Sequence, residues 1–89
     1  MLQIERSNQF KKDLKRVLKR GKNPELLKAI IDALVNSHAL PSKNRDHKLS
    51  GNYSNYRECH IEPDWLLIYY TSETVLRLER TGSHADLFE

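Results

Sequence analysis

The sequence contains one cysteine, Cys59, among its 89 residues. A single cysteine cannot form a disulfide within the chain, and it leaves no CxxC spacing for structural zinc. The fold must therefore be stabilised by packing. A chain of this length forms one compact domain that buries roughly 60 to 70% of the surface exposed when unfolded, so deep enclosed pockets are not expected.

Long apolar runs are also missing. No stretch reaches the roughly 18 apolar residues of a membrane helix, and residues 1–6 lack the basic-then-apolar order of a secretion signal. The sequence has no internal repeat and no low-complexity tract. With 38% hydrophobic and 30% charged residues, it has enough apolar material for a core. We therefore expect one cytoplasmic domain over residues 1–89, with no membrane partner.

Acidic residues are scarce at one end of the chain. Residues 1–22 carry eight Lys or Arg against two acids, a net charge of +6, whereas residues 23–89 carry seven against ten, a net charge of −3. A dense positive patch attracts phosphate backbones irrespective of base sequence, so nucleic acid or an acidic protein is the expected partner. An ordinary solvated helix face explains the charge equally well.

The N-terminal part has the patterns of one strand and two helices. Residues 2–5 alternate as in a strand, and Ser7 can cap a helix predicted over residues 8–20. Asn23 before Pro24 predicts the start of a second helix. Each helix has one apolar stripe, so the pair is expected to pack as a hairpin on a sheet. The first helix presents to solvent the cations Lys11, Lys12, Lys15, Arg16, Lys19 and Arg20.

The C-terminal part predicts a loop followed by three strands. Residues 37–55 lose all periodicity, which predicts a loop with at most a brief helical turn, and long loops of this kind commonly carry function. Residues 56–61, 65–70 and 74–80 have strand patterns separated by turn signals, which predicts an antiparallel meander, and residues 81–89 are expected to form a tail. The predicted fold class is α+β in the order β-α-α-β-β-β, with the first strand at an undetermined edge.

Three of the four histidines lie in this second half. His47 is on the loop that enters the meander, His60 and Asp64 flank the first hairpin, and Arg80 and His84 lie at the exit of the last strand. The first and third strands of a meander run in the same direction, so their ends share one edge of the sheet. We therefore predict that these five residues cluster there.

Such a cluster suits RNA cleavage through the 2′-hydroxyl. That reaction needs a base, an acid for the leaving 5′-oxygen and a cation for the phosphate, and histidine carries protons near neutral pH. Arg80 or Arg57 can bind the phosphate. No metal or other cofactor is required. A metal site of His47, His60, Asp64 and His84 is chemically allowed but lacks a supporting spacing, and each histidine taken alone is better explained by a single hydrogen bond.

Cys59 and several aromatic residues have two interpretations. Cys59 adjoins His60, but adjacent strand residues point to opposite faces, so we interpret Cys59 as part of the core. Trp65 and Phe88 can either stack on RNA bases or pack in the core, and a chain end with Leu87 and Phe88 offers an apolar anchor.

Three segments then identify a family. Residues 46–51 (DHKLSG), 56–69 (YRECHIEPDWLLIY) and 78–88 (LERTGSHADLF) resemble, in order and spacing, the YafQ family of RelE-type bacterial toxins. The resemblance implies a RelE-like fold, a ribosome-dependent mRNA endonuclease that cuts in the decoding site, and a partner antitoxin. It leaves open whether the toxin–antitoxin complex also binds operator DNA.

The resemblance also assigns residues. The family's active positions fall on His47, His60, Asp64, Trp65, Arg80, His84 and Phe88. By this assignment His84 and either Asp64 or His60 share acid and base duties, Arg80 binds the scissile phosphate, His47 supports it, and Trp65 and Phe88 position nucleotides. The cationic helix is expected to contact ribosomal RNA. The competing hypotheses are a ParE-like gyrase poison and a simple basic nucleic-acid-binding module, neither of which needs the histidines.

Overall fold

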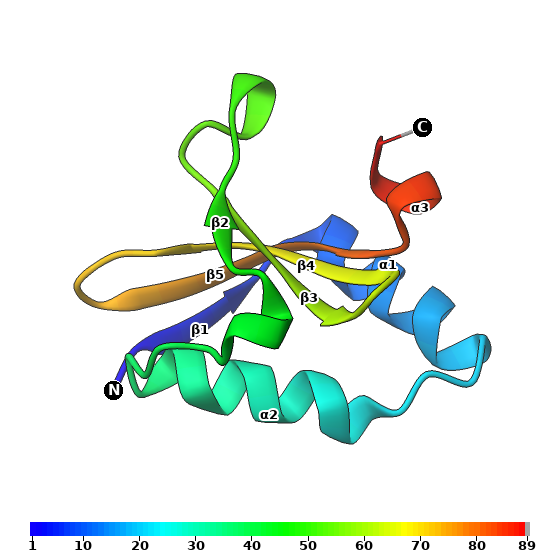
Figure 1. Cartoon of the computed structure of the whole chain (residues 1–89), viewed down its shortest axis with the longest axis horizontal. Helices are drawn as coiled ribbons and strands as arrows, with labels where there is room; N and C mark the ends of the chain where they lie inside the picture. The colour runs from blue at the N-terminus through cyan, green and yellow to red at the C-terminus, as the bar shows by residue number, and fades with distance from the viewer. Residues whose placement is uncertain (89) are drawn as a thin grey trace.

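A computed structural model describes residues 1–88 and shows a five-stranded sheet with two long helices on one face (Figure 1). In Figure 1, α1 and α2 lie below the sheet, and the β2 region and α3 rise from its other face. The elements are β1 (Gln3–Arg6), α1 (Asn8–Lys19), α2 (Pro24–Val35), the 3-10 turn η1 (Ser42–Asn44), β2 (His47–Lys48), the 3-10 turn η2 (Gly51–Tyr53), β3 (Arg57–Glu62), β4 (Trp65–Thr71), β5 (Val75–Gly82) and α3 (His84–Phe88).

Both predicted helix starts are confirmed. The Ser7 hydroxyl accepts a hydrogen bond from the Phe10 amide at 2.9 Å, and the Asn23 side chain accepts one from the Glu25 amide at 3.0 Å. These caps satisfy amides that have no partner within a first helical turn. The apolar stripes of the two helices then face the sheet, and their buried residues are Phe10, Val17, Leu27, Ile30, Leu34 and Val35.

The sheet has the order β1-β5-β4-β3-β2. The antiparallel meander of β3, β4 and β5 is confirmed, and β1 takes the edge beside β5 in parallel orientation. Two expectations need correction. The predicted loop over residues 37–55 does contain short helical turns, η1 and η2, but it also contains the short strand β2, which was not predicted and which pairs with β3. The predicted tail over residues 81–89 instead completes β5 and forms α3, while Glu89 lies outside the described residues.

The two faces of the sheet have different surroundings. Cys59, Leu67 and Tyr69 face the helices and belong to the main core, which confirms the packing role of Cys59. Leu66 and Ile68 face the other way and form a small cluster with Leu87 of α3. This face, called the open face below, is covered by no long helix and is bordered by the β2 region and α3 (Figure 1), although Leu66 and Ile68 on it are fully buried. Within residues 1–88, no helix has the length and apolar character needed to span a membrane.

Candidate active site

The strand register explains why residues distant in sequence meet on the open face. His47 pairs with Glu58, Glu58 pairs with Ile68, and Ile68 pairs with Arg80, so these four residues form one row across the sheet. Paired residues share a face, and so do residues two apart on one strand. His60 lies two residues after Glu58 and therefore joins the same face.

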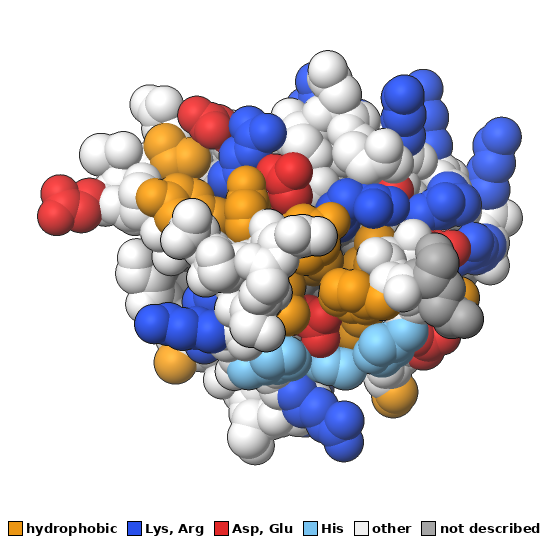
Figure 2. All heavy atoms as spheres, turned by 90° about the horizontal axis from the view of Figure 1, so that it is seen from above, with side chains coloured by type: hydrophobic (Ala, Val, Ile, Leu, Met, Phe, Trp, Pro, Cys, Tyr) orange, Lys and Arg blue, Asp and Glu red, His pale blue; other side chains and the backbone are white. Residues whose placement is uncertain are grey.

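The three histidines lie side by side, as predicted. The ring centroids of His47 and His60 are 6.4 Å apart, and those of His60 and His84 are 5.7 Å apart. His84 comes from α3, directly after β5, whose last residue Gly82 pairs with Leu66 next to His60. Figure 2 shows the histidines as a line along one side of an apolar hollow, with acidic groups beside them.

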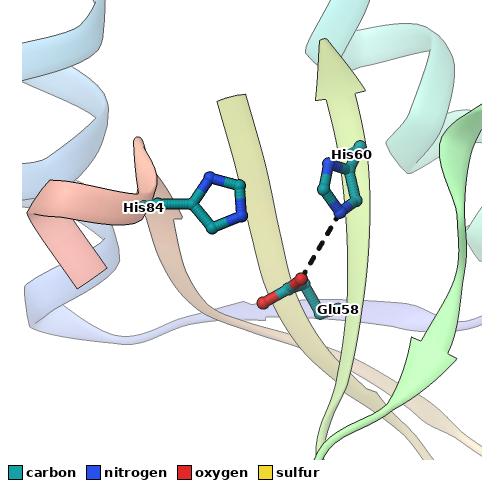
Figure 3. Close-up of side chains that lie close together, drawn as sticks. All are labelled: Glu58, His60 and His84. Atoms are coloured by element: carbon teal, nitrogen blue, oxygen red, sulfur yellow. Dashed lines mark ion pairs between the residues drawn. The ribbon is translucent and has the colours of Figure 1, made fainter. Parts of the chain in front are cut away.

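Glu58 joins this cluster and was not among the predicted site residues. It is only 5% exposed, and its Oε1 lies 3.5 Å from Nε2 of His47. The same oxygen lies 3.5 Å from Nε2 of His60 (Figure 3). The sequence did contain a signal. Glu58 and His60 are two residues apart on a predicted strand, so they had to share a face.

His84 and Asp64 form a direct pair. The Nδ1 atom of His84 lies 2.7 Å from Asp64 Oδ1, which also accepts the His84 backbone amide at 2.9 Å. These two hydrogen bonds, first from the backbone and then from the ring, hold the pKa of Asp64 below its usual value. Both side chains are more than half exposed. Asp64 thus holds the His84 ring through Nδ1, and the Nε2 atom of His84 stays accessible.

The other two histidines are oriented in the same way. Nδ1 of His47 lies 2.7 Å from the Arg45 carbonyl, and Nδ1 of His60 lies 3.2 Å from the Pro63 carbonyl. A carbonyl oxygen only accepts hydrogen bonds, so each Nδ1 carries the proton. In all three rings Nε2 is therefore the nitrogen without a proton; that of His84 is available for proton transfer, whereas those of His47 and His60 each face Glu58 Oε1 at 3.5 Å.

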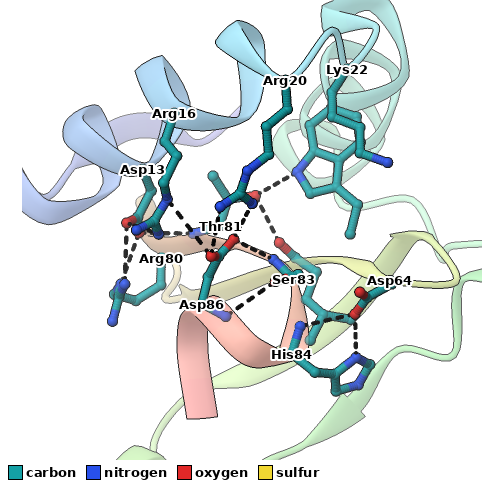
Figure 4. Close-up of polar contacts among 12 residues, drawn as sticks. Asp13, Arg16, Arg20, Lys22, Asp64, Arg80, Thr81, Ser83, His84 and Asp86 are labelled. Atoms are coloured by element: carbon teal, nitrogen blue, oxygen red, sulfur yellow. Dashed lines mark hydrogen bonds and ion pairs between the residues drawn. The ribbon is translucent and has the colours of Figure 1, made fainter. Parts of the chain in front are cut away.

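Arg80 lies on the predicted edge, but its guanidinium is engaged. Its Nε and Nη2 donate to the two oxygens of Asp13 at 2.8 and 3.1 Å (Figure 4). Burial alone would raise the pKa of Asp13, but hydrogen bonds from Arg80, Gln9 and Thr81 outweigh it and lower that pKa. The Arg80 side chain stays 19% exposed. Only the part of the guanidinium that does not bind Asp13 is available to a phosphate.

Two substrate-binding expectations conflict with the structure. Arg57 pairs with Tyr69 in the sheet and so faces the helices, where its Nε lies 3.1 Å from Asp46. It is on the opposite side of the sheet from His60. Trp65 is 1% exposed, and its indole Nε1 donates to the Thr81 hydroxyl at 2.9 Å. Since the ring is enclosed in the core, it has no free face on which a base could stack.

Phe88 has the exposure that Trp65 lacks. It is 47% exposed, and its ring centroid lies 6.5 Å from that of His84. Leu87 beside it is 8% exposed and packs against the sheet, so the predicted apolar anchor is Leu87. Phe88 therefore presents an aromatic surface next to the histidine line.

The cationic helix α1 divides into two groups. Arg20 forms a two-point ion pair with Asp86 of α3, and Arg16 contacts Asp13 at 3.2 Å (Figure 4). These two arginines are therefore engaged within the protein. The exposed cations of α1 that form no ion pair in the described part of the chain are Lys11, Lys12, Lys15 and Lys19.

One subset of the cluster has the composition of a metal site. Glu58, His60 and His84 each offer one ligand atom, and these atoms lie within 4.8 Å of one another. Imidazole nitrogen and carboxylate oxygen are suitable ligands for zinc or copper. The metal site considered from the sequence, His47, His60, Asp64 and His84, shares His60 and His84 with this group but contains His47 and Asp64 in place of Glu58.

Comparisons with known proteins are consistent with this geometry. The family model described as the bacterial toxin of type II toxin–antitoxin systems, YafQ, matches residues 2–89. The mRNA interferase toxin YafQ of Escherichia coli strain K12 is 46% identical over 86 residues, which cover 96% of this chain and 94% of that protein.

Solved structures agree in fold. The toxin in the crystal structure of the E. coli DinJ–YafQ toxin–antitoxin complex matches with a TM-score of 0.91 and 45% identity, covering 99% of this chain and 98% of that one. A metal-bound toxin from Helicobacter pylori matches with a TM-score of 0.92 and 43% identity, covering 99% of this chain and all of that one. The chain therefore belongs to the YafQ family of bacterial toxins of type II toxin–antitoxin systems.

Proposed function

We propose that this toxin is an endoribonuclease that cuts mRNA in the decoding site of the ribosome and thereby inhibits translation. The observation that carries the proposal is the pair His60 and His84, whose rings lie 5.7 Å apart on an open face. Each ring contacts a carboxylate, Glu58 or Asp64. Two such imidazoles can act as base and acid on either side of one phosphodiester.

The reaction needs no covalent enzyme intermediate. One imidazole takes the proton of the 2′-hydroxyl while that oxygen attacks phosphorus. The bond from phosphorus to the 5′-oxygen breaks, and the other imidazole gives its proton to the leaving oxygen. The products are a 2′,3′-cyclic phosphate and a 5′-hydroxyl. Asp64 orients His84 through Nδ1, as the acidic member of a triad orients its histidine.

The remaining residues have supporting roles in this proposal. Protonated His60 can donate from Nε2 to Glu58, which would stabilise the acid form. His47 lies on the other side of Glu58 and supports the same carboxylate. Phe88 can stack on a nucleotide beside His84. Arg80 stabilises the phosphate charge through the part of its guanidinium that Asp13 leaves free.

The partners follow from charge and from the relatives. The four lysines of α1 that form no ion pair in the described chain can contact ribosomal RNA. Because E. coli YafQ is seen in a complex with DinJ, we propose that this toxin also has a cognate antitoxin. An acidic segment of that antitoxin would suit the basic helix. The proposed site of action is the cytoplasm, where ribosomes and mRNA are present.

A bound transition metal should inhibit this reaction. A metal held by Glu58, His60 and His84 would occupy the nitrogens that the proposal uses for proton transfer. We therefore expect zinc or copper to reduce cleavage by programmed ribosomes, and a chelator to restore it. Loss of cleavage on chelation, with the ribosomes intact, would instead support metal-dependent catalysis.

The central test compares His84→Ala and Asp64→Asn with the wild type. Mapping of mRNA 5′ ends after induction should show cuts for the wild type, essentially none for His84→Ala and fewer for Asp64→Asn. His38→Ala is the matched control because His38 is exposed and lies outside the site. Growth arrest by His84→Ala without mRNA cuts would refute the nuclease and favour a gyrase poison.

A second test concerns the binding of the toxin to the ribosome through the lysines of α1. Reversing the charge of Lys11, Lys15 and Lys19 should weaken cleavage on ribosomes most at low salt. The difference from the wild type should shrink as the salt concentration rises, because salt screens the phosphate contacts that the wild type makes. If the reversal abolishes all activity while His84→Ala retains it, the protein is a basic nucleic-acid-binding module and the proposed catalytic cluster is wrong.

A further inference from the structure

Most arginines of this protein are held in ion pairs. Within residues 1–88 the exceptions are Arg6 and Arg45, which form none. Arg6 ends β1, at the edge of the sheet opposite to β2. Arg45 is exposed and lies two residues before His47. The position of Arg45 next to the histidine line, with its charge not compensated by a carboxylate, suggests a role in anion binding.

The backbone of Arg45 supports that role. Its φ and ψ of 47° and 44° are left-handed, a conformation that costs energy for a residue other than glycine. Its amide donates to the Ser42 carbonyl at 3.0 Å, and its carbonyl accepts from His47 Nδ1 at 2.7 Å. The turn therefore holds an arginine where a glycine would fit with less strain. Such strained residues concentrate at functional sites.

A cavity of about 300 Å³ lies beside this turn. Its lining includes Lys43, Arg45 and His60. The buried side chain of Asn44 donates to the His60 carbonyl at 2.7 Å and so ties the turn to β3. Glu62 also lines the cavity, but Lys22 pairs with its carboxylate at 3.0 Å. The charge facing the cavity is thus dominated by Lys43 and Arg45.

We propose that this cavity binds a nucleotide next to the scissile bond, with Arg45 and Lys43 contacting its phosphodiester. The volume lies at the lower end of the range for small-ligand pockets, which suits one nucleotide. A guanidinium can bind two phosphate oxygens at once, and the lysine adds a second positive charge. Arg45 would thereby supply the phosphate binding that Arg57 cannot provide and Arg80 provides only in part. This inference rests on the proposed RNA-cleaving function.

The test measures binding separately from cleavage. A short oligoadenylate with 2′-O-methyl riboses cannot be cut, so it reports binding alone. Its titration into the labelled protein should shift the NMR signals of residues 43–45 and 60–62. Arg45→Gly should weaken the affinity by about tenfold or more, as expected for the loss of charge-assisted hydrogen bonds. Glycine suits the left-handed backbone, so this variant should fold.

Two variants complete the experiment. Arg45→Lys should lose less affinity than Arg45→Gly because it keeps the charge without the two-point geometry. Arg6→Ala is the matched control and should bind like the wild type. Equal binding by Arg45→Gly and the wild type, or signal shifts confined to α1, would overturn the proposal. If the cavity binds the oligonucleotide but wild-type protein cuts no mRNA on ribosomes, the subsite stands and the proposed nuclease function fails.

Discussion

Among individual side chains, Glu58 connects two of the histidines through one buried carboxylate. It lies between His47 and His60 in the row that crosses β2 and β3. A buried carboxylate costs energy unless positive or hydrogen-bonding groups compensate it. The Nε2 atoms of His47 and His60, each 3.5 Å from Glu58 Oε1, lie where they can provide such compensation.

We expect Glu58→Gln to reduce kcat by about a hundredfold, within the range of a general acid–base effect. Initial rates on programmed ribosomes provide the measurement. A variant that folds and keeps the wild-type rate would remove Glu58 from the proposed mechanism.

Substitution of Trp65 should change the stability of the protein and leave RNA binding unchanged. Its indole nitrogen binds Thr81, whose hydroxyl in turn donates to the Leu66 carbonyl at 2.7 Å. Trp65→Phe should lower the free energy of unfolding by about 1–2 kcal/mol through the lost hydrogen bond and the smaller ring. Affinity for RNA should not change. Quenching of Trp65 fluorescence by RNA, together with weaker binding by the phenylalanine variant, would contradict the core assignment.

Among the structural elements, α3 determines where His84 stands. This short helix is joined to α1 by the pair Arg20–Asp86, which also holds the pKa of Asp86 well below its usual range. Asp86 additionally accepts from the Ser83 amide at 2.9 Å. Gly82 precedes this turn with φ of +156°, and a Cβ there would lie 2.8 Å from Asp86 Oδ2.

Asp86→Asn and Gly82→Ala should each displace α3 and lower kcat by roughly tenfold, because small misplacements of a reacting group are costly. The NMR signals of the His84 ring should shift in both variants. Lys28→Ala removes another exposed ion pair, Lys28–Asp32, and should leave activity unchanged. Wild-type rates in both Asp86→Asn and Gly82→Ala would show that His84 is positioned by Asp64 alone.

For the whole molecule, Asp13 connects the helical layer to the end of the sheet. It is 1% exposed and binds Arg80, Arg16 and the Thr81 amide. Since its pKa is lower in the folded state, it contributes stability at pH values above the unfolded pKa of about 3.9. That contribution is lost as the pH falls through the folded pKa.

Asp13→Asn should therefore cost about 3 kcal/mol of unfolding free energy near neutral pH, as for breaking a buried ion pair. The difference between variant and wild type should shrink in acid, as the pH falls below the unfolded pKa toward the lower folded pKa. Denaturant unfolding at pH 7 and near pH 3 measures both effects. A difference that stays constant between the two pH values would mean that Asp13 acts through packing rather than charge.

Local patterns were sufficient for much of this protein. Caps at Ser7 and Asn23, apolar stripes and strand alternation depend on neighbours a few residues apart, so the helices and the meander could be predicted. The gathering of the histidines also followed, because the direction of strands in a meander determines which ends meet. The resemblance of the three C-terminal segments identified the family, which the family model confirmed over residues 2–89.

The tertiary structure decided which of the charged and aromatic side chains are free to act. Arg80 binds Asp13, 67 residues away, and no local pattern encodes that pairing. Register placed Arg57 on the helix side of the sheet and Glu58 among the histidines, and packing enclosed Trp65. Sequence determined the kinds of residues that gather at this edge because periodicity is local, whereas their availability depends on contacts between distant segments.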